Sequence, residues 1–172
     1  MNLLFEMIVV ASDGVGVGKL DRVLVDPVRR QLTHVVIGSS SLNADVLVPL
    51  SLVQGSSDRC LLLHAASRAL GNMPLYEADR TGLPPFHRVV LDGVTETDDQ
   101  RETLEEALEL TGRLVELGAE TRVSALDEPD AQLVGLAADE TTHCLTQIIV
   151  RGFGQRELVV PAHWLAYEPD RW

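Results

Sequence analysis

The chain has 172 residues, of which 45% are hydrophobic and 4% are aromatic, and its formal net charge is -12. This apolar content is sufficient for packed cores and excludes a chain that is mainly disordered. The negative charge excludes nucleic acid and anionic membranes as expected direct partners, because phosphate groups attract clusters of Lys and Arg.

The N-terminal run from residue 3 to residue 11 is apolar and predicts a first strand. It contains Glu6, and it has neither a basic leader nor a small-residue cleavage site, so it does not resemble a secretion signal. The sequence has no apolar stretch near the roughly 20 residues that a membrane-spanning helix needs. We therefore expect a cytoplasmic protein with no membrane insertion.

Three alternating glycines, Gly14, Gly16 and Gly18, follow the turn signal Ser12-Asp13. A glycine-rich loop that binds phosphate lies between a strand and the N-terminus of a helix. Here the next segment, 20–25, is rich in β-branched residues and predicts another strand. A hairpin is therefore favoured over a phosphate site.

The rest of the first half continues as short strands separated by turn residues. Asp26-Pro27 interrupts the chain because proline cannot donate to a β-ladder. Further strands are predicted at 31–37, 46–50 and 60–64, followed by an irregular segment at 70–76.

A different pattern occupies the middle of the chain. Thr97 and Gln100 have the spacing of a helix N-cap, the apolar residues that follow have helical spacing, and Gly112 is a typical stop. This predicts one acidic helix, about 98–111, within a linker at 80–112. A solvated helix face is the favoured explanation of its acids, and a docking surface for a basic partner is the alternative.

The second half repeats the first. The segment Leu20 to Ile37 matches Leu133 to Val150, with Leu133 following Leu20 by 113 positions. The match aligns Asp26 with Asp139, Leu32 with Leu145 and Thr33 with Thr146, and a shift of one residue aligns Val46-Leu47-Val48-Pro49 with Leu158-Val159-Val160-Pro161. Strands are predicted at 113–117, 121–124, 133–138, 144–151 and 157–160. The conserved strand phase indicates a duplicated β-unit.

Both halves resemble the PRC-barrel family, which includes the barrel of the photosynthetic reaction centre H subunit and that of RimM-type ribosome maturation factors. The resemblance is carried by "GVGKLDRVLVDPVRRQLTHVVI" and "VLVPLSLV" in the first half, and by "LVGLAADETTHCLTQIIV" and "ELVVPAHWL" in the second. It implies a mainly β fold with two small antiparallel barrels in tandem, at 1–79 and 113–172. It also implies a docking module without catalytic residues. The segment "DEPDA" at 127–131 departs from the family turn.

The strands of the repeat are apolar on both faces, although a barrel strand needs only one apolar face. We expect the second face to lose water against the linker helix, the sister barrel or another chain. Intramolecular packing is the favoured explanation, and a homodimer or partner interface is the alternative. The predicted interface residues are Val35, Ile37, Ile148, Val150, Trp164 and Trp172.

No residue pattern predicts a catalytic, cofactor-binding or metal-binding site. Cys60 and Cys144 have no metal-type spacing, and His143 and Cys144 are neighbours on a predicted strand, so their side chains point to opposite faces. The leading hypothesis is a non-catalytic protein-binding or assembly module that binds a protein partner or itself. The alternatives are a small-molecule sensor, with a cleft between the barrels near Trp164 and Trp172, and a ribosome-assembly accessory protein.

Overall fold

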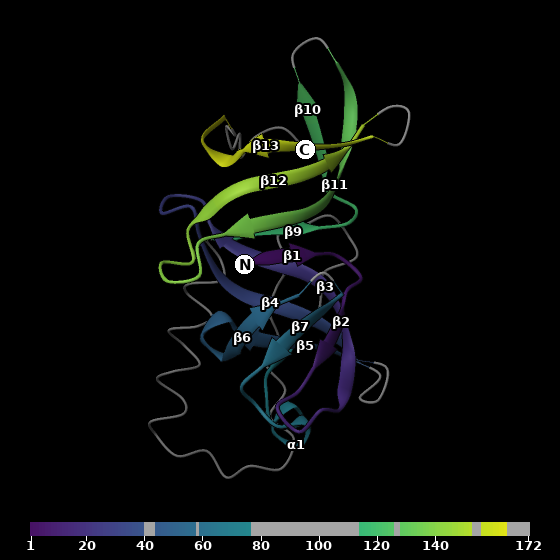
Figure 1. Ribbon diagram of the computed structural model, residues 1–172, viewed down its shortest axis with the longest axis vertical. Coiled ribbons are helices and arrows are strands. Elements are labelled where there is room, and N and C mark those ends of the chain that lie inside the picture. Colours follow the sequence, from purple (N-terminus) through teal and green to yellow (C-terminus); the bar gives the residue numbers. More distant parts are fainter. Residues whose placement is uncertain (40–43, 58, 77–113, 126–127, 153–155, 165–172) are drawn as a thin grey trace.

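The computed structural model describes residues 1–39, 44–57, 59–76, 114–125, 128–152 and 156–164 (Figure 1). These residues are mainly β, which confirms the predicted fold class at that level. The acidic helix predicted at 98–111 and the predicted boundaries near residues 79 and 113 lie outside the described residues.

The strands form two sheets (Figure 1). The larger sheet has the order β6 (Val53–Ser56), β7 (Cys60–Leu63), β2 (Ile8–Val10), β3 (Gly16–Asp26), β4 (Gln31–Ser39), β5 (Ala44–Pro49) and β8 (Leu75–Tyr76), with β9 (Val115–Gly118) also paired to β3. The smaller sheet has the order β1 (Asn2–Leu4), β11 (Glu128–Ala138), β12 (Leu145–Arg151) and β13 (Glu157–Pro161), with β10 (Arg122–Ala125) also paired to β11. Among the described residues, the ladders do not close either sheet into a ring.

Three short helical turns complete the described fold. They are η1 (Leu50–Leu52), α1 (Ser67–Leu70) and η2 (Ala162–Trp164). The segment 70–76, which was predicted to be irregular, contains the last residue of α1 and the short strand β8. The strand predicted at 3–11 is divided into β1 and β2, because Glu6 adopts a positive φ of 68° and turns the chain between them.

The duplicated sequence folds into duplicated structure. We call β3, β4 and β5 the first repeat and β11, β12 and β13 the second repeat. The first hairpin turn places Asp26 Oδ1 as the acceptor for the backbone N–H groups of Val28 and Arg29 at 2.9 and 3.0 Å. At the matching positions Asp139 Oδ1 accepts from Thr141 and Thr142 at 3.0 and 2.7 Å. An aspartate that binds its own turn in this way fixes the hairpin locally.

Two further details recur at the same spacing. Arg30 and His143 both have positive φ, at 52° and 57°, at the ends of the two turns. The hydroxyl of Thr33 donates to the Leu24 carbonyl at 3.2 Å, and the hydroxyl of Thr146 donates to the Ala137 carbonyl at 3.0 Å. The repeat is therefore preserved in backbone conformation as well as in sequence.

Two strands, β1 and β9, each lie one strand before the strand that directly precedes a repeat, and each pairs with the other repeat. β1 lies antiparallel to β11 with Leu3 opposite Leu136, and β9 lies antiparallel to β3 with Leu117 opposite Val23. Leu136 and Val23 are matching positions of the two repeats. The exchange is therefore reciprocal, and β1 and β9 pair with the opposite repeats in the same register. The two antiparallel barrels in tandem that the resemblance implies are not confirmed, because these two ladders run between the repeats.

A tight turn follows each of the two exchanged strands and directs the chain back to its own repeat. Met7 N–H donates to the Leu4 carbonyl between β1 and β2, and Thr121 N–H donates to the Gly118 carbonyl between β9 and β10. Each turn sends one strand to the opposite repeat and the next strand to its own. Figure 1 shows β1 and β9 where the two sheets meet.

The two hairpin turns also contact each other. Leu32 N–H donates to the His143 carbonyl at 2.9 Å, and Leu145 N–H donates to the Arg30 carbonyl at 2.8 Å. Leu32 matches Leu145 and Arg30 matches His143 in the repeat. An approximate two-fold axis therefore relates the two hydrogen bonds to each other.

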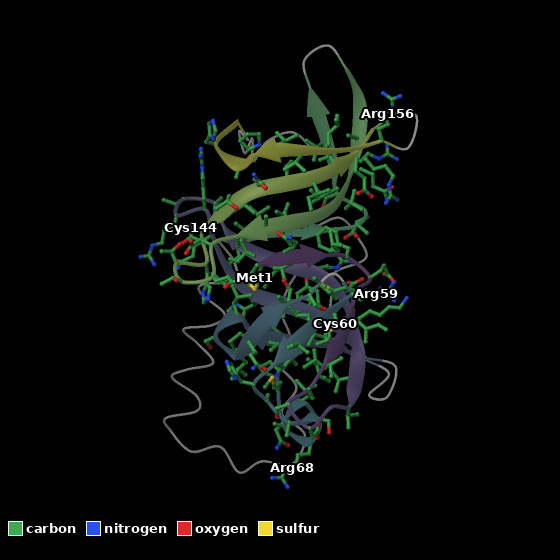
Figure 2. All side chains as sticks on the ribbon, viewed as in Figure 1. Met1, Arg59, Cys60, Arg68, Cys144 and Arg156 are labelled. Atoms are coloured by element: carbon green, nitrogen blue, oxygen red, sulfur yellow. The ribbon has the colours of Figure 1, made fainter. Side chains whose placement is uncertain are left out.

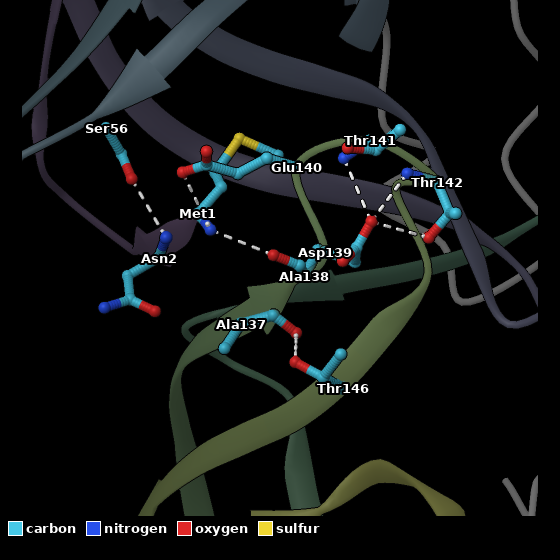
Figure 3. Close-up of polar contacts among 10 residues, drawn as sticks. All are labelled: Met1, Asn2, Ser56, Ala137, Ala138, Asp139, Glu140, Thr141, Thr142 and Thr146. Atoms are coloured by element: carbon cyan, nitrogen blue, oxygen red, sulfur yellow. Dashed lines mark hydrogen bonds and ion pairs between the residues drawn. The ribbon is translucent and has the colours of Figure 1, made fainter.

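The N-terminal strand is held at its start by polar contacts (Figure 3). The amino group of Met1 donates to the Ala138 carbonyl at 2.9 Å and lies 3.3 Å from a Glu140 carboxylate oxygen. The backbone N–H of Asn2 donates to the Ser56 hydroxyl at 2.9 Å, which connects β1 to β6 as well. This strand of the smaller sheet is therefore also hydrogen-bonded to the edge of the larger sheet.

The hydrophobic core is common to both repeats. One continuous cluster of buried side chains includes Leu20 and Leu32 of the first repeat, Leu133 and Leu136 of the second, and Leu3 of the exchanged strand. A core that crosses the repeats in this way links their stability, because opening either one exposes apolar surface of the other.

Gly135 tests the strand exchange because it lies directly under β1. A Cβ atom at this position would be 2.6 Å from the Leu3 carbonyl oxygen, whereas a Cβ atom at Gly152 would meet nothing within 4 Å. We expect Gly135→Ala to lower the free energy of unfolding by about 1–3 kcal/mol through overpacking, and Gly152→Ala to change it by less than about 0.5 kcal/mol. Urea unfolding measures both. Equal effects of the two substitutions would contradict the close packing of β1 on β11.

Candidate interaction surface

The structure places four of the predicted interface residues in the shared core. Val35 and Ile37 in β4 and Ile148 and Val150 in β12 are all buried, and all four belong to the same cluster. Their side chains pack within the chain and do not lie at its surface. The side chain of Trp164 and the whole of Trp172 lie outside the described residues.

A second, smaller apolar cluster covers the other face of the first repeat. It contains Leu24, Val36, Leu47 and Tyr76, with Leu114 packed against it. Tyr76 comes from β8, which lies beside β5. Both faces of β4 are thus removed from water by segments of the same chain.

The second repeat does not have this cover. Leu158 and Val159 in β13 are 58% and 59% exposed, although the matching residues of the first repeat, Val46 and Leu47, are only 1% and 8% exposed. Successive strand residues point to opposite faces, so apolar surface is open on both sides of β13. Sequence reasoning did not identify this surface, because the residues are equally apolar in both repeats.

The difference arises at the sheet edge. In the first repeat β8 pairs with β5, with Leu75 opposite Val46. In the second repeat β13 is the last strand of its sheet, and within the described ranges no strand pairs with its outer edge (Figure 1). An exposed apolar edge strand is a site where another chain can add a strand.

Basic and acidic side chains lie at the start of β13. Arg151 and Glu157 form an ion pair of 2.7 Å, and Arg156 is exposed beside them. Figure 2 shows Arg156 at this end of the smaller sheet. The edge therefore combines an apolar strand with a cation at one end.

Charged side chains also connect the first repeat to the exchanged strand β9. Arg22 in β3 lies 3.4 Å from a Glu116 oxygen and 2.8 Å from a Glu120 oxygen, and its side chain is 25% exposed. Burial and the neighbouring Glu116 carboxylate raise the pKa of Tyr76, so its hydroxyl stays protonated. Arg22, Glu116 and Tyr76 come from three strands, β3, β9 and β8, and form one partly buried polar network.

This network gives a double-mutant test. We expect Arg22→Met and Glu116→Gln each to lower the free energy of unfolding by about 1–3 kcal/mol, because each weakens the ion pairing of a partly buried side chain. The double variant should lose about 0.5–3 kcal/mol less than the sum of the single losses. Thermal or urea unfolding measures the cycle. Arg29→Met is the control, since that side chain is 77% exposed and lies 3.9 Å from Asp26; strictly additive losses at Arg22 and Glu116 would contradict the network.

The Asp139 turn makes stability depend on pH. Hydrogen bonds from the backbone and side chain of Thr142, and from the backbone of Thr141, hold the pKa of Asp139 below its ordinary value of 3.8 (Figure 3). The ionised carboxylate therefore favours the folded chain, and its contribution is present above about pH 4 and is lost as the pH falls through the lowered pKa.

We expect the melting temperatures of the wild-type chain and of Asp139→Asn to differ most near neutral pH and to converge towards pH 3. The substitution removes the titrating group and keeps a side-chain acceptor. Thermal unfolding followed from about pH 7 to pH 3 measures the difference. A difference that stays constant over this range would show that Asp139 does not act through its charge.

The remaining chemically reactive residues are not brought together. Cys60 and Cys144 are free thiols that lie apart (Figure 2). Within the described ranges no three His, Cys, Asp or Glu side chains are grouped as metal ligands. The glycines Gly16 and Gly18 lie in strand β3, in agreement with the hairpin predicted for that segment.

In the part of the chain that the structure describes, no helix has the length and apolar character needed to cross a membrane.

Comparison with models of protein families and with curated proteins gives no match to this chain.

Proposed function

We propose that the chain is a non-catalytic protein-binding or assembly module built from two PRC-like units, and that it acts in the cytoplasm. The observation that carries this proposal is the unequal exposure of matching apolar residues. Leu158 and Val159 are more than half exposed, whereas Val46 and Leu47 are buried. Apolar surface that one copy of a repeat buries and the other leaves open is typical of a site covered by a partner.

The sequence resemblance supports the same function. Its motifs coincide with the strands and turns of the two repeats, and the family's barrels serve as docking modules. The exchange of β1 and β9 would make the two units one rigid platform, because neither unit can separate without breaking a ladder of the other.

A different protein is favoured over a second copy of the chain as the partner. Each copy carries a formal charge of -12, and like net charges oppose self-association. The local charge at β13 is different, since the described side chains at its start are those of Arg151, Arg156 and the acid Glu157. A homodimer through β13 is the alternative mode of assembly.

Site-specific photocrosslinking tests the proposal. A photoreactive phenylalanine analogue replaces Val159 in one variant and Val28 in a control, because Val28 is an exposed apolar residue, at 91%, in the turn after β3. We expect adducts with other proteins in native extract from position 159 and none from position 28. No adduct at 159, or the same adducts at both positions, would contradict binding at β13.

A further inference from the structure

The first repeat shows what kind of segment covers this edge. β8 runs antiparallel to β5, with Leu75 opposite Val46 and Tyr76 opposite Asp45. One residue earlier, the Pro74 carbonyl accepts a hydrogen bond of 2.9 Å from Leu47 N–H. A proline, an aliphatic residue and an aromatic residue in succession therefore cover the first edge.

The second edge has the same backbone geometry. Leu47 is opposite Val36 in the β4–β5 ladder, and Val159 is opposite Ile149 in the β12–β13 ladder, which are matching pairs. Because Leu47 N–H points away from β4, towards Pro74, the shared register directs Val159 N–H away from β12 in the same manner. The amide needed to bind an incoming carbonyl is thus at the open edge.

The side chains also correspond. Tyr76 packs with Val36 and Leu47 in the first repeat, and the matching surface of the second repeat consists of half-buried Ile149 and exposed Val159. An aromatic residue there would remove this surface from water.

The charge at the end of the edge differs between the repeats. For a strand with the register of β8, the position after the aromatic residue is opposite Ala44 of the first repeat. The matching residue in the second repeat is Arg156, which is exposed. An acidic residue after the aromatic one would therefore meet an arginine at this edge.

We propose that β13 binds an extended segment of another protein, in which a proline, an aliphatic residue, an aromatic residue and an acidic residue follow one another. The segment adds to the smaller sheet as an antiparallel strand beside β13. This inference rests on the proposed function and specifies the chemistry of the partner.

A labelled peptide with the sequence NMPLYE, that of residues 72–77, is a suitable probe for the full-length chain. Fluorescence anisotropy should show saturable binding to the wild-type protein. Val159→Pro should weaken binding at least about tenfold, because it removes the outward N–H, and it should leave the β12–β13 ladder intact. Val159→Lys is a second test that keeps the N–H and places a charge on the apolar surface. Val28→Ala is the control and should bind as the wild type does.

Charge reversal gives an independent readout. The peptide NMPLYK should bind the wild-type protein about two- to fivefold more weakly than NMPLYE, and Arg156→Glu should restore its binding. Absence of saturable binding to the wild type would overturn the proposal. So would equal binding by the Val159 variants, or a concentration-dependent dimer in light scattering that Val159→Pro abolishes, since β13 would then pair with a second copy.

The two proposals can fail separately. If position 159 gives adducts with other proteins but NMPLYE does not bind, the strand-addition chemistry is wrong and protein binding at β13 remains. If neither experiment gives a signal at β13, both proposals are wrong.

Discussion

The reciprocal pairing of β1 with β11 and of β9 with β3 is the interaction on which the rest of the structure depends. It places Leu3 and Leu117 against matching positions of opposite repeats, so that one core is shared. Backbone ladders and apolar burial act at the same two strands, which makes separation of the repeats costly. The Arg22 network lies on one of these ladders and adds a polar constraint to it.

This arrangement has the symmetry of a dimer within one chain. The contact between the two hairpin turns, Leu32 with His143 and Leu145 with Arg30, joins matching residues in the way an isologous interface does. The symmetry ends at the outer edges. β8 covers the first repeat, whereas β13 is open in the described structure, and the candidate binding surface arises from that difference.

Much of the fold could be predicted from local sequence patterns. The Asp26 and Asp139 turns, the flanking strands and the hairpin at Gly14 all follow from residues close together in the chain, because turn residues and strand alternation act over a few positions. The division of the run at 3–11 was not predicted, since nothing in its apolar pattern reveals that Glu6 adopts a positive φ. The predicted interface residues Val35, Ile37, Ile148 and Val150 lie in the core, because an apolar pattern indicates burial without indicating which chain provides it.

The sequence by itself determined that the chain is mainly β, that it contains two copies of one strand-and-turn unit, and where the turns of each copy lie. Only the tertiary structure decided which strand joins which sheet and which apolar residues remain exposed. The physical reason is that ladder pairing and burial depend on partners far away in the chain. Val46 and Leu158 belong to the same pattern, yet a segment near residue 75 covers one and leaves the other in water.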